Sequence, residues 1–291
     1  MRSWHPLLLL AVALCVPRLS AAVKITDAVY EGRPQFKIVT PDATWFYDKA
    51  GGGFSRLIDR DGRDWIGFHR DPLDQSPASA AAGYRGMPNA IVGKGNTDAG
   101  AGHPGFNLCE STRAAGDLIR TVSKSGRWAW TWRFTDTEAV FTMEKADPAY
   151  PWWFLYEASI AGRFAPHQQY WGTDLGGPRH ETPDHKGNQE DIGGHWRWAY
   201  FGDASSDRVL FIANLQRTAF PSMFSYFGDT TADLASPDGM VVFGFGRTTG
   251  SLGPHISGPG AQFAVGFSEG RISDEKAHER LAGKIDRLIA H

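Results

Sequence analysis

Cysteine is nearly absent from this chain, which has two cysteines among 291 residues. Cys15 lies in an N-terminal apolar run that we expect to be removed, so the mature chain keeps Cys109 and forms no internal disulfide. The core must therefore be stable without cross-links. A lone cysteine is more often a small buried apolar residue than a nucleophile, and we expect this of Cys109.

The chain also lacks an apolar run long enough to span a bilayer, which takes about 20 residues. Its longest run, residues 7–16, follows Arg2 and precedes the small residues Ser20, Ala21 and Ala22. This pattern is typical of a secretory signal peptide. We predict cleavage after Ala22, a secreted or periplasmic protein, and no insertion into the membrane.

An excess of charge of either sign is missing too, since 30 Lys and Arg stand against 32 Asp and Glu, a net charge of −2. Without a basic stripe or tail, nucleic acid and anionic membranes are poor partners. The expected ligand is neutral, or an anion bound by a few local arginines. No linker, repeat or low-complexity tract interrupts the sequence, so we expect residues 23–291 to form one domain.

Tryptophan, glycine and proline are abundant, with 11, 34 and 17 residues. This composition, with few helical windows, predicts an all-β protein with long loops. Apolar or alternating runs predict strands at 36–39, 44–47, 54–58, 118–123, 127–135, 139–146, 152–159, 195–200, 209–215, 240–246 and 262–267, and alternation along 195–200 would place Trp196, Trp198 and Tyr200 together. One C-terminal helix is expected from the spacing of Ala277, Leu281, Ile285 and Leu288, with Ser273 as its cap.

The segment 53–68, GFSRLIDRDGRDWIGF, follows a short strand and a glycine turn and precedes a long loop. It resembles the N-terminal edge of the galactose mutarotase-like supersandwich proteins. The resemblance implies a twisted two-sheet β-sandwich of the kind shared by sugar epimerases, several polysaccharide lyases and domains of glycoside hydrolases. It implies a carbohydrate partner without selecting a reaction.

Two long loop-rich excursions, residues 69–117 and 162–194, concentrate the aromatic and ionisable residues outside the predicted strands. Loops of such length in compact domains are usually functional or disordered. Aromatic rings can cover the apolar face of a sugar ring. The rings of Trp128, Trp130 and Trp132 are expected mainly in the core. The predicted sugar-binding residues are Tyr84, Trp171, Trp196, Arg197, Trp198 and Tyr200.

The first hypothesis for the reaction is β-elimination by a polysaccharide lyase acting on a uronic-acid-containing glycan. Arg85 and Asn89 would hold the uronate, and His103 or His195 would accept the proton. Tyr170 or Tyr200 would donate one. Arg85 and Asn89 could instead have purely structural roles in their loop.

Carboxylates suggest two further possibilities. Glu157 and Glu190 could be the paired acids of a glycoside hydrolase, which needs carboxyl groups about 5–9 Å apart. Asp184, Asn188, Glu190 and Asp191 could hold a structural calcium ion. His180, His185 and His195 add imidazoles nearby, but no pair has the spacing of a zinc motif, and we predict no metal or other cofactor.

Three functions therefore remain open from the sequence. A lyase is favoured because the loops concentrate His, Arg, Asn and Glu. A hydrolase or sugar epimerase on the same fold is the first alternative, and a noncatalytic glycan-binding protein of the cell envelope is the second. Each requires that the two excursions cover the same face of the sandwich.

Overall fold

A computed structural model describes residues 23–69, 83–93, 95–185, 191–228, 239–248 and 253–290 of the chain. The predicted signal peptide, residues 1–22, lies outside the described residues. Within them, the strands pair antiparallel in three sheets and one long helix follows at the C-terminus. The prediction of a β-sandwich with a C-terminal helix is confirmed.

The first sheet is a four-stranded meander in the order β1-β2-β3-β4. Its strands are β1 (Lys24–Tyr30), β2 (Arg33–Val39), β3 (Ala43–Asp48) and β4 (Gly53–Asp59). Alternation along β3 turns Trp45 and Tyr47 into the core.

The largest sheet has nine strands in the order β11-β10-β13-β14-β17-β8-β7-β6-β5. They are β5 (Cys109–Ala115), β6 (Leu118–Ser123), β7 (Ala129–Phe134), β8 (Glu138–Lys145), β10 (Gln169–Thr173), β11 (Gly176–Arg179), β13 (Trp198–Asp203), β14 (Arg208–Asn214) and β17 (Gln262–Glu269). Trp128, Trp130 and Trp132 are fully buried, so the expectation that they belong to the core is confirmed.

The third sheet has four strands in the order β12-β15-β16-β9. They are β9 (Phe154–Ala158), β12 (Ile192–Trp196), β15 (Phe220–Phe227) and β16 (Met240–Phe245). Two short 3₁₀ helices, η2 (Ile160–Gly162) and η3 (Pro166–Gln168), connect β9 to β10.

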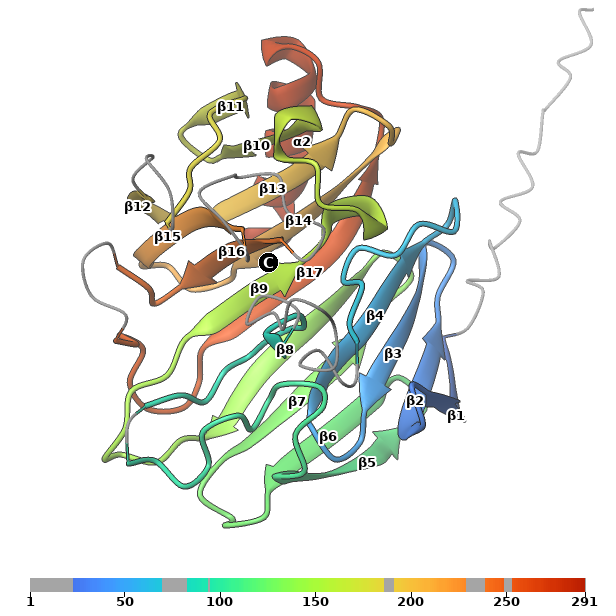
Figure 1. Cartoon of the computed structure of the whole chain (residues 1–291), viewed down its shortest axis with the longest axis vertical. Helices are drawn as coiled ribbons and strands as arrows, with labels where there is room; N and C mark the ends of the chain where they lie inside the picture. Colours follow the sequence, from blue (N-terminus) through green and yellow to red (C-terminus); the bar gives the residue numbers. More distant parts are fainter. Residues whose placement is uncertain are drawn as a thin grey trace, which may run out of the picture.

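Both small sheets pack on one face of the nine-stranded sheet. Phe54 of β4 lies edge-on to Trp132 at 4.6 Å between ring centroids, and Phe154 of β9 stacks on Phe263 of β17 at 4.5 Å. The two small sheets together form a second layer. Figure 1 shows β1–β4 at one side of this second layer and β12, β15 and β16 at the other, with β9 between them. The core lies between the two layers and is largely aromatic.

A short segment joins the two small sheets edge to edge. The amide of Phe54 donates to the Met87 carbonyl at 2.6 Å, and Gly86 exchanges two backbone hydrogen bonds with Glu157 at 2.5 and 3.1 Å. A Cβ at Gly86, where φ is 152°, would collide with Pro104. Only glycine therefore fits this position. Because Met87 and Gly86 bond to β4 and β9 respectively, the segment joins these two strands into one continuous layer.

The helix α2 (Glu275–Ile289) covers the outer face of the nine-stranded sheet. Its N-cap is Asp274, whose carboxylate accepts from the Ala277 amide at 2.7 Å, so the predicted cap was one residue early. Ala277, Leu281 and Ile285 are buried as predicted. No helix of the described residues is long and apolar enough to cross a bilayer.

Candidate functional site

The outer face of the third sheet carries a row of side chains that includes buried polar residues, beside the small apolar cluster of Phe227, Met240 and Val242. In β9, Phe154 and Tyr156 turn into the sandwich, so Glu157 turns the opposite way. Glu157 pairs with Val242 of β16, and Val242 pairs with Ser225 of β15. These three side chains therefore lie in line on one face of the sheet.

Glu157 is 6% exposed. Its Oε2 accepts a hydrogen bond from the Asn89 side-chain amide. Burial disfavours the charged form and raises the pKa of Glu157 to about 7, while the Asn89 hydrogen bond and the Arg247 charge partly oppose that rise. A carboxyl with a pKa near neutrality can take up or release a proton under ordinary conditions.

Arg247 follows β16 and is 4% exposed. Its Nη1 donates to the Val242 carbonyl at 3.3 Å and to Ser225 Oγ at 3.5 Å. Burial lowers the pKa of Arg247, and the carboxylates of Glu157 and Asp191 oppose that change. The hydrogen bonds to Val242 and Ser225 use the same nitrogen, and both are long.

His185 and Asp191 approach the same row from the second excursion. His185 Nδ1 lies 3.2 Å from Ser225 Oγ and 3.9 Å from Asp191 Oδ1. The imidazole ring stacks on Phe227, with centroids 4.5 Å apart. Burial raises the pKa of Asp191, and its buried Oδ1 makes no hydrogen bond to the described residues.

These six residues form one unit, which we name the Glu157 cluster: Asn89, Glu157, His185, Asp191, Ser225 and Arg247. Asn89 comes from the first excursion, and His185 and Asp191 come from the second. Both excursions thus contribute members to the cluster, and the prediction that they cover one sugar-binding face stays a prediction. Buried polar atoms usually have partners, so the unpartnered Oδ1 of Asp191 and the neighbouring Arg247 and Glu157 suit a ligand rich in hydroxyl groups.

Two residues of the predicted lyase site are held by other contacts. Arg85 is buried, and it donates to the carbonyls of Gly67 at 2.9 Å and Gly239 at 3.3 Å. His103 is 1% exposed and lies edge-on to Phe106. Burial lowers the pKa of His103 to about 4, and its ring nitrogens make no hydrogen bond although the backbone of Tyr84 and Pro104 is close.

Of the remaining predicted catalytic residues, the two that the structure describes, His195 and Tyr170, lie on different sheets. His195 is exposed on β12 and opposes Pro221, on the same face of the sheet as Ser225. Tyr170 is buried toward α2, where its hydroxyl accepts from the Ile272 amide at 3.1 Å. Glu190 lies outside the described residues. The catalytic roles assigned to these three residues stay predictions.

The predicted aromatic surface is corrected by burial. Trp171, Trp196, Trp198 and Tyr200 are at most 3% exposed. We expected Trp196, Trp198 and Tyr200 to share one strand. Instead, the chain changes sheets between β12 and β13, so Trp196 faces the sandwich core while Trp198 and Tyr200 face α2. Both faces of β13 are covered, and its rings are core residues.

Two predicted sugar-binding residues remain nearer the surface. Tyr84 is 49% exposed at the start of the segment that carries Asn89. Arg197 is half-buried between β12 and β13, and its amide donates to Asp174 Oδ1 at 3.1 Å. Their contact with sugar stays a prediction.

Sequence reasoning missed Arg247 and Ser225. Arg247 comes directly after an apolar strand, and Ser225 is a polar residue within one. The signal that could have found them is a charged or hydroxyl side chain in or beside an apolar strand. Glu157, within the predicted strand 152–159, shows the same signal.

No metal site emerges from the described residues, in which no three His, Cys, Asp or Glu side chains form a group that could hold an ion. The residues considered for calcium are divided. Asp184 and Asp191 are described, whereas Asn188 and Glu190 lie outside the described residues. A calcium ion at this position stays a prediction.

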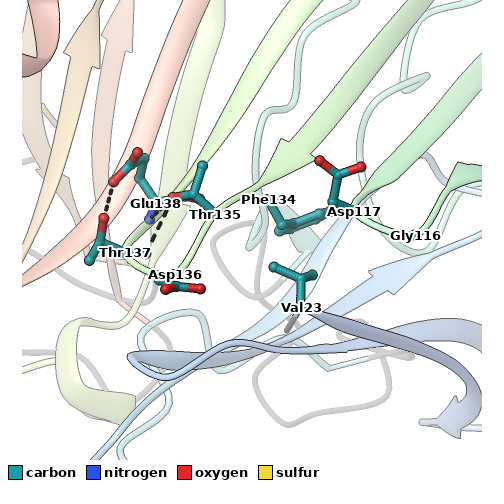
Figure 2. A pocket seen from close by; sticks show the side chains of 8 residues that line it. All are labelled: Val23, Gly116, Asp117, Phe134, Thr135, Asp136, Thr137 and Glu138. Carbon is teal, nitrogen blue, oxygen red and sulfur yellow. Dashed lines mark hydrogen bonds between the residues drawn. The ribbon is translucent and has the colours of Figure 1, made fainter. Parts of the chain in front are cut away.

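A groove of about 670 Å³ lies elsewhere, between the β5–β6 turn and the β7–β8 turn (Figure 2). Asp117, Asp136 and Glu138 line it, and Asp117 pairs with Arg133 at 2.7 Å. Glu138 accepts a hydrogen bond from Thr137. This groove contains no member of the Glu157 cluster, and we do not assign it to the same site.

Comparison with known proteins supports the fold. No family model matches the chain, and no curated protein does. The crystal structure of HI1317 is similar, with a TM-score of 0.51 and 11% identity over 88% of this chain and 98% of that one. A galactose mutarotase-like protein from Lactobacillus casei gives 0.48 and 10% over 80% and 99%. A Paenibacillus xanthan lyase gives 0.49 and 9% over 90% of this chain and 26% of the lyase.

At such identities the likeness concerns the fold alone. The chain resembles galactose mutarotase-like proteins in structure, as the sequence resemblance predicted.

Proposed function

We propose that this protein is an enzyme that transfers protons at the ring of a small sugar, and that it interconverts the two anomers of an aldose. The observation that supports this most is Glu157. It is a buried carboxyl with a pKa raised to about 7, and it lies near the buried guanidinium of Arg247 and near Asp191, whose buried Oδ1 has no hydrogen-bond partner among the described residues. Such a group suits general acid–base catalysis at neutral pH.

The reaction needs one proton acceptor and one proton donor. The carboxylate of Glu157 takes the proton of the anomeric hydroxyl, the bond between C1 and the ring oxygen breaks, and C1 becomes a carbonyl carbon. The electron pair of the broken bond goes to the ring oxygen, which takes a proton from the imidazolium of His185. Rotation about the C1–C2 bond and reversal of these steps give the other anomer and return both protons.

Asp191 supports the donor role of His185. Its Oδ1 lies 3.9 Å from His185 Nδ1, so its carboxylate stabilises the protonated ring. Ser225 Oγ, at 3.2 Å from the same nitrogen, and the Phe227 ring fix the orientation of the imidazole.

The charges of the cluster favour an uncharged sugar. Arg247 is its one arginine or lysine among the described residues, and Glu157 and Asp191 both act on it. A uronate would add a third carboxylate around one guanidinium. The burial of Glu157 and Arg247 also favours a single sugar ring over a long chain.

A lyase remains the competing function. In the form predicted from the sequence, Arg85 and Asn89 hold the uronate and His103 accepts the proton. The contacts of Arg85 with two backbone carbonyls, of Asn89 with Glu157, and the burial of His103 all favour structural or positioning roles instead.

The test compares the wild-type protein with Glu157→Gln. Freshly dissolved pure anomers of several aldoses are followed by polarimetry. Uronate polymers are followed by ultraviolet absorbance, and neutral oligosaccharides by the release of reducing ends. We expect faster anomer equilibration by the wild type and a loss of about 100-fold or more in the variant. Unsaturated products or new reducing ends would assign a lyase or a hydrolase, and sugar binding without turnover would assign a binding protein.

We also propose that the protein acts outside the cytoplasm after removal of residues 1–22. The supporting observation is the sequence pattern of Arg2, the apolar run 7–16 and the small residues up to Ala22. N-terminal sequencing of the protein recovered from a secreting host should begin at Val23.

A further inference from the structure

We propose that Asn89 is a positioning residue of this site, which holds Oε2 of Glu157 and leaves Oε1 as the oxygen that exchanges a proton with the sugar. The role in turnover rests on the function proposed above. The sequence suggested that Asn89 binds a uronate, but its side-chain amide donates to Glu157 instead.

The backbone places Asn89 with little freedom. Its φ is 40°, a left-handed value that asparagine tolerates better than most residues. Its amide donates to the Gly102 carbonyl at 2.9 Å, and its own carbonyl accepts from Trp153 Nε1 at 2.7 Å. The backbone N–H and C=O of Asn89 are thus both held by hydrogen bonds, independently of the side-chain contact with Glu157.

The surrounding strands fix the distance between the two residues. Gly86 pairs with Glu157, and the Pro88 carbonyl accepts from the Leu155 amide at 2.7 Å. The segment that carries Asn89 therefore runs alongside β9. Asn89 and Glu157 are 68 residues apart in sequence and have one fixed relation in the fold.

The chemistry of the contact is directional. The amide nitrogen can only donate, so it favours the ionised form of Glu157 over the protonated form. The other oxygen of the carboxyl, Oε1, makes no hydrogen bond to the described residues. The charged groups near this pair are Arg247, which acts on Glu157, and Asp191, which acts on Arg247 and is itself affected by Asp184.

The decisive variant is Asn89→Gly, which deletes the amide and tolerates the positive φ. The titration of Glu157 is followed by NMR of carboxyl groups labelled with ¹³C in glutamate, and Glu157→Gln identifies the signal. We expect the titration midpoint of Glu157 to rise by about one unit. If anomer turnover is present, the acidic limb of its pH profile should shift to higher pH by the same amount as the Glu157 titration midpoint. The kcat at pH 7 should fall roughly tenfold, with little change in KM.

Glu31→Gly is the matched control, because Glu31 has a φ of 50° in the exposed β1–β2 turn. It should change neither the titration nor turnover. An unchanged Glu157 titration in Asn89→Gly, with the fold intact by circular dichroism, would overturn the positioning role. Absence of turnover in the wild type at every pH would instead reject the proposed function, and the NMR measurement would still decide whether Asn89 controls Glu157.

Discussion

The outer face of the nine-stranded sheet beneath α2 and the outer face of the third sheet both bury polar side chains. Beneath α2, Trp198 Nε1 donates to Asp286 at 3.0 Å, and the Tyr200 hydroxyl lies 3.3 Å from His278 Nδ1. On the third sheet, Arg247 makes two long hydrogen bonds through one nitrogen. Polar side chains are matched with one another in the first region, whereas in the second the buried Oδ1 of Asp191 has no hydrogen-bond partner among the described residues.

This difference distinguishes stability from function. Matched polar atoms beneath α2 fix how the helix sits on the sheet. Polar atoms without partners are costly to bury, and such costs are typically retained at sites that act on a ligand. Burial of an aromatic or charged residue alone therefore does not identify a site, and the gathering of several ionisable side chains on one face of a sheet is the stronger signal.

The largest effect on stability is expected beneath α2. Trp198→Ala removes a fully buried ring and its hydrogen bond to Asp286. We expect the free energy of unfolding to fall by about 3–5 kcal/mol, measured by denaturant titration. Turnover per folded molecule should be unchanged, and a shift in its pH profile would contradict the separation of the two regions.

The site should show the opposite behaviour in Glu157→Gln. The pKa of Glu157 rises from 4.5 to about 7 on folding, so the unfolded chain loses its proton first as the pH increases. Burial of Glu157 therefore lowers the free energy of unfolding at high pH. This loss is absent below pH 4.5, grows between pH 4.5 and 7, and then stays constant at about 3 kcal/mol.

Because the glutamine variant has no such loss, it should gain stability relative to the wild type across that interval while losing turnover. Unfolding free energies at pH 4, 5.5 and 8 would measure this gain. Parallel curves for the two proteins would show that Glu157 is not buried as described.

The smallest of these effects compares two equally buried arginines. Arg247 and Arg208 are both 4% exposed, but Arg208 forms an ion pair with Asp61 at 2.8 Å. Arg247→Met removes a charge that lowers the pKa of both Glu157 and Asp191, so both should rise. We expect kcat/KM at pH 7 to fall roughly tenfold and the pH profile to move upward.

Arg208→Met is the control for loss of a buried cation. It should lower stability without moving the pH profile. Equal pH profiles for the two variants would contradict the claim that Arg247 controls the protonation of Glu157 and Asp191.

Most of the fold was predictable because strands and helices have short periods. The run 118–123 matches β6 at both ends, and the spacing of Ala277, Leu281 and Ile285 matches the buried face of α2. Local alternation fixes which residues share a face, whatever the rest of the chain does.

The candidate site was less predictable because it depends on pairing between distant segments. Glu157 and Asn89 were both noticed in the sequence, but their contact follows from the pairing of Gly86 with β9, which no local pattern contains. The aromatic surface failed for a related reason. Alternation put Trp196 and Trp198 on one face, and only the change of sheet between them separates the two rings.

The edge-to-edge contact through Gly86 and Met87 has a consequence for fragments of this protein. A chain without the first four strands would keep every ionisable group of the Glu157 cluster. It would nevertheless lose Phe54, whose amide anchors Met87, and with it the support of the peptide that presents Asn89. Residues 23–59 are thus needed for an ordered acid–base centre to which they contribute no side chain.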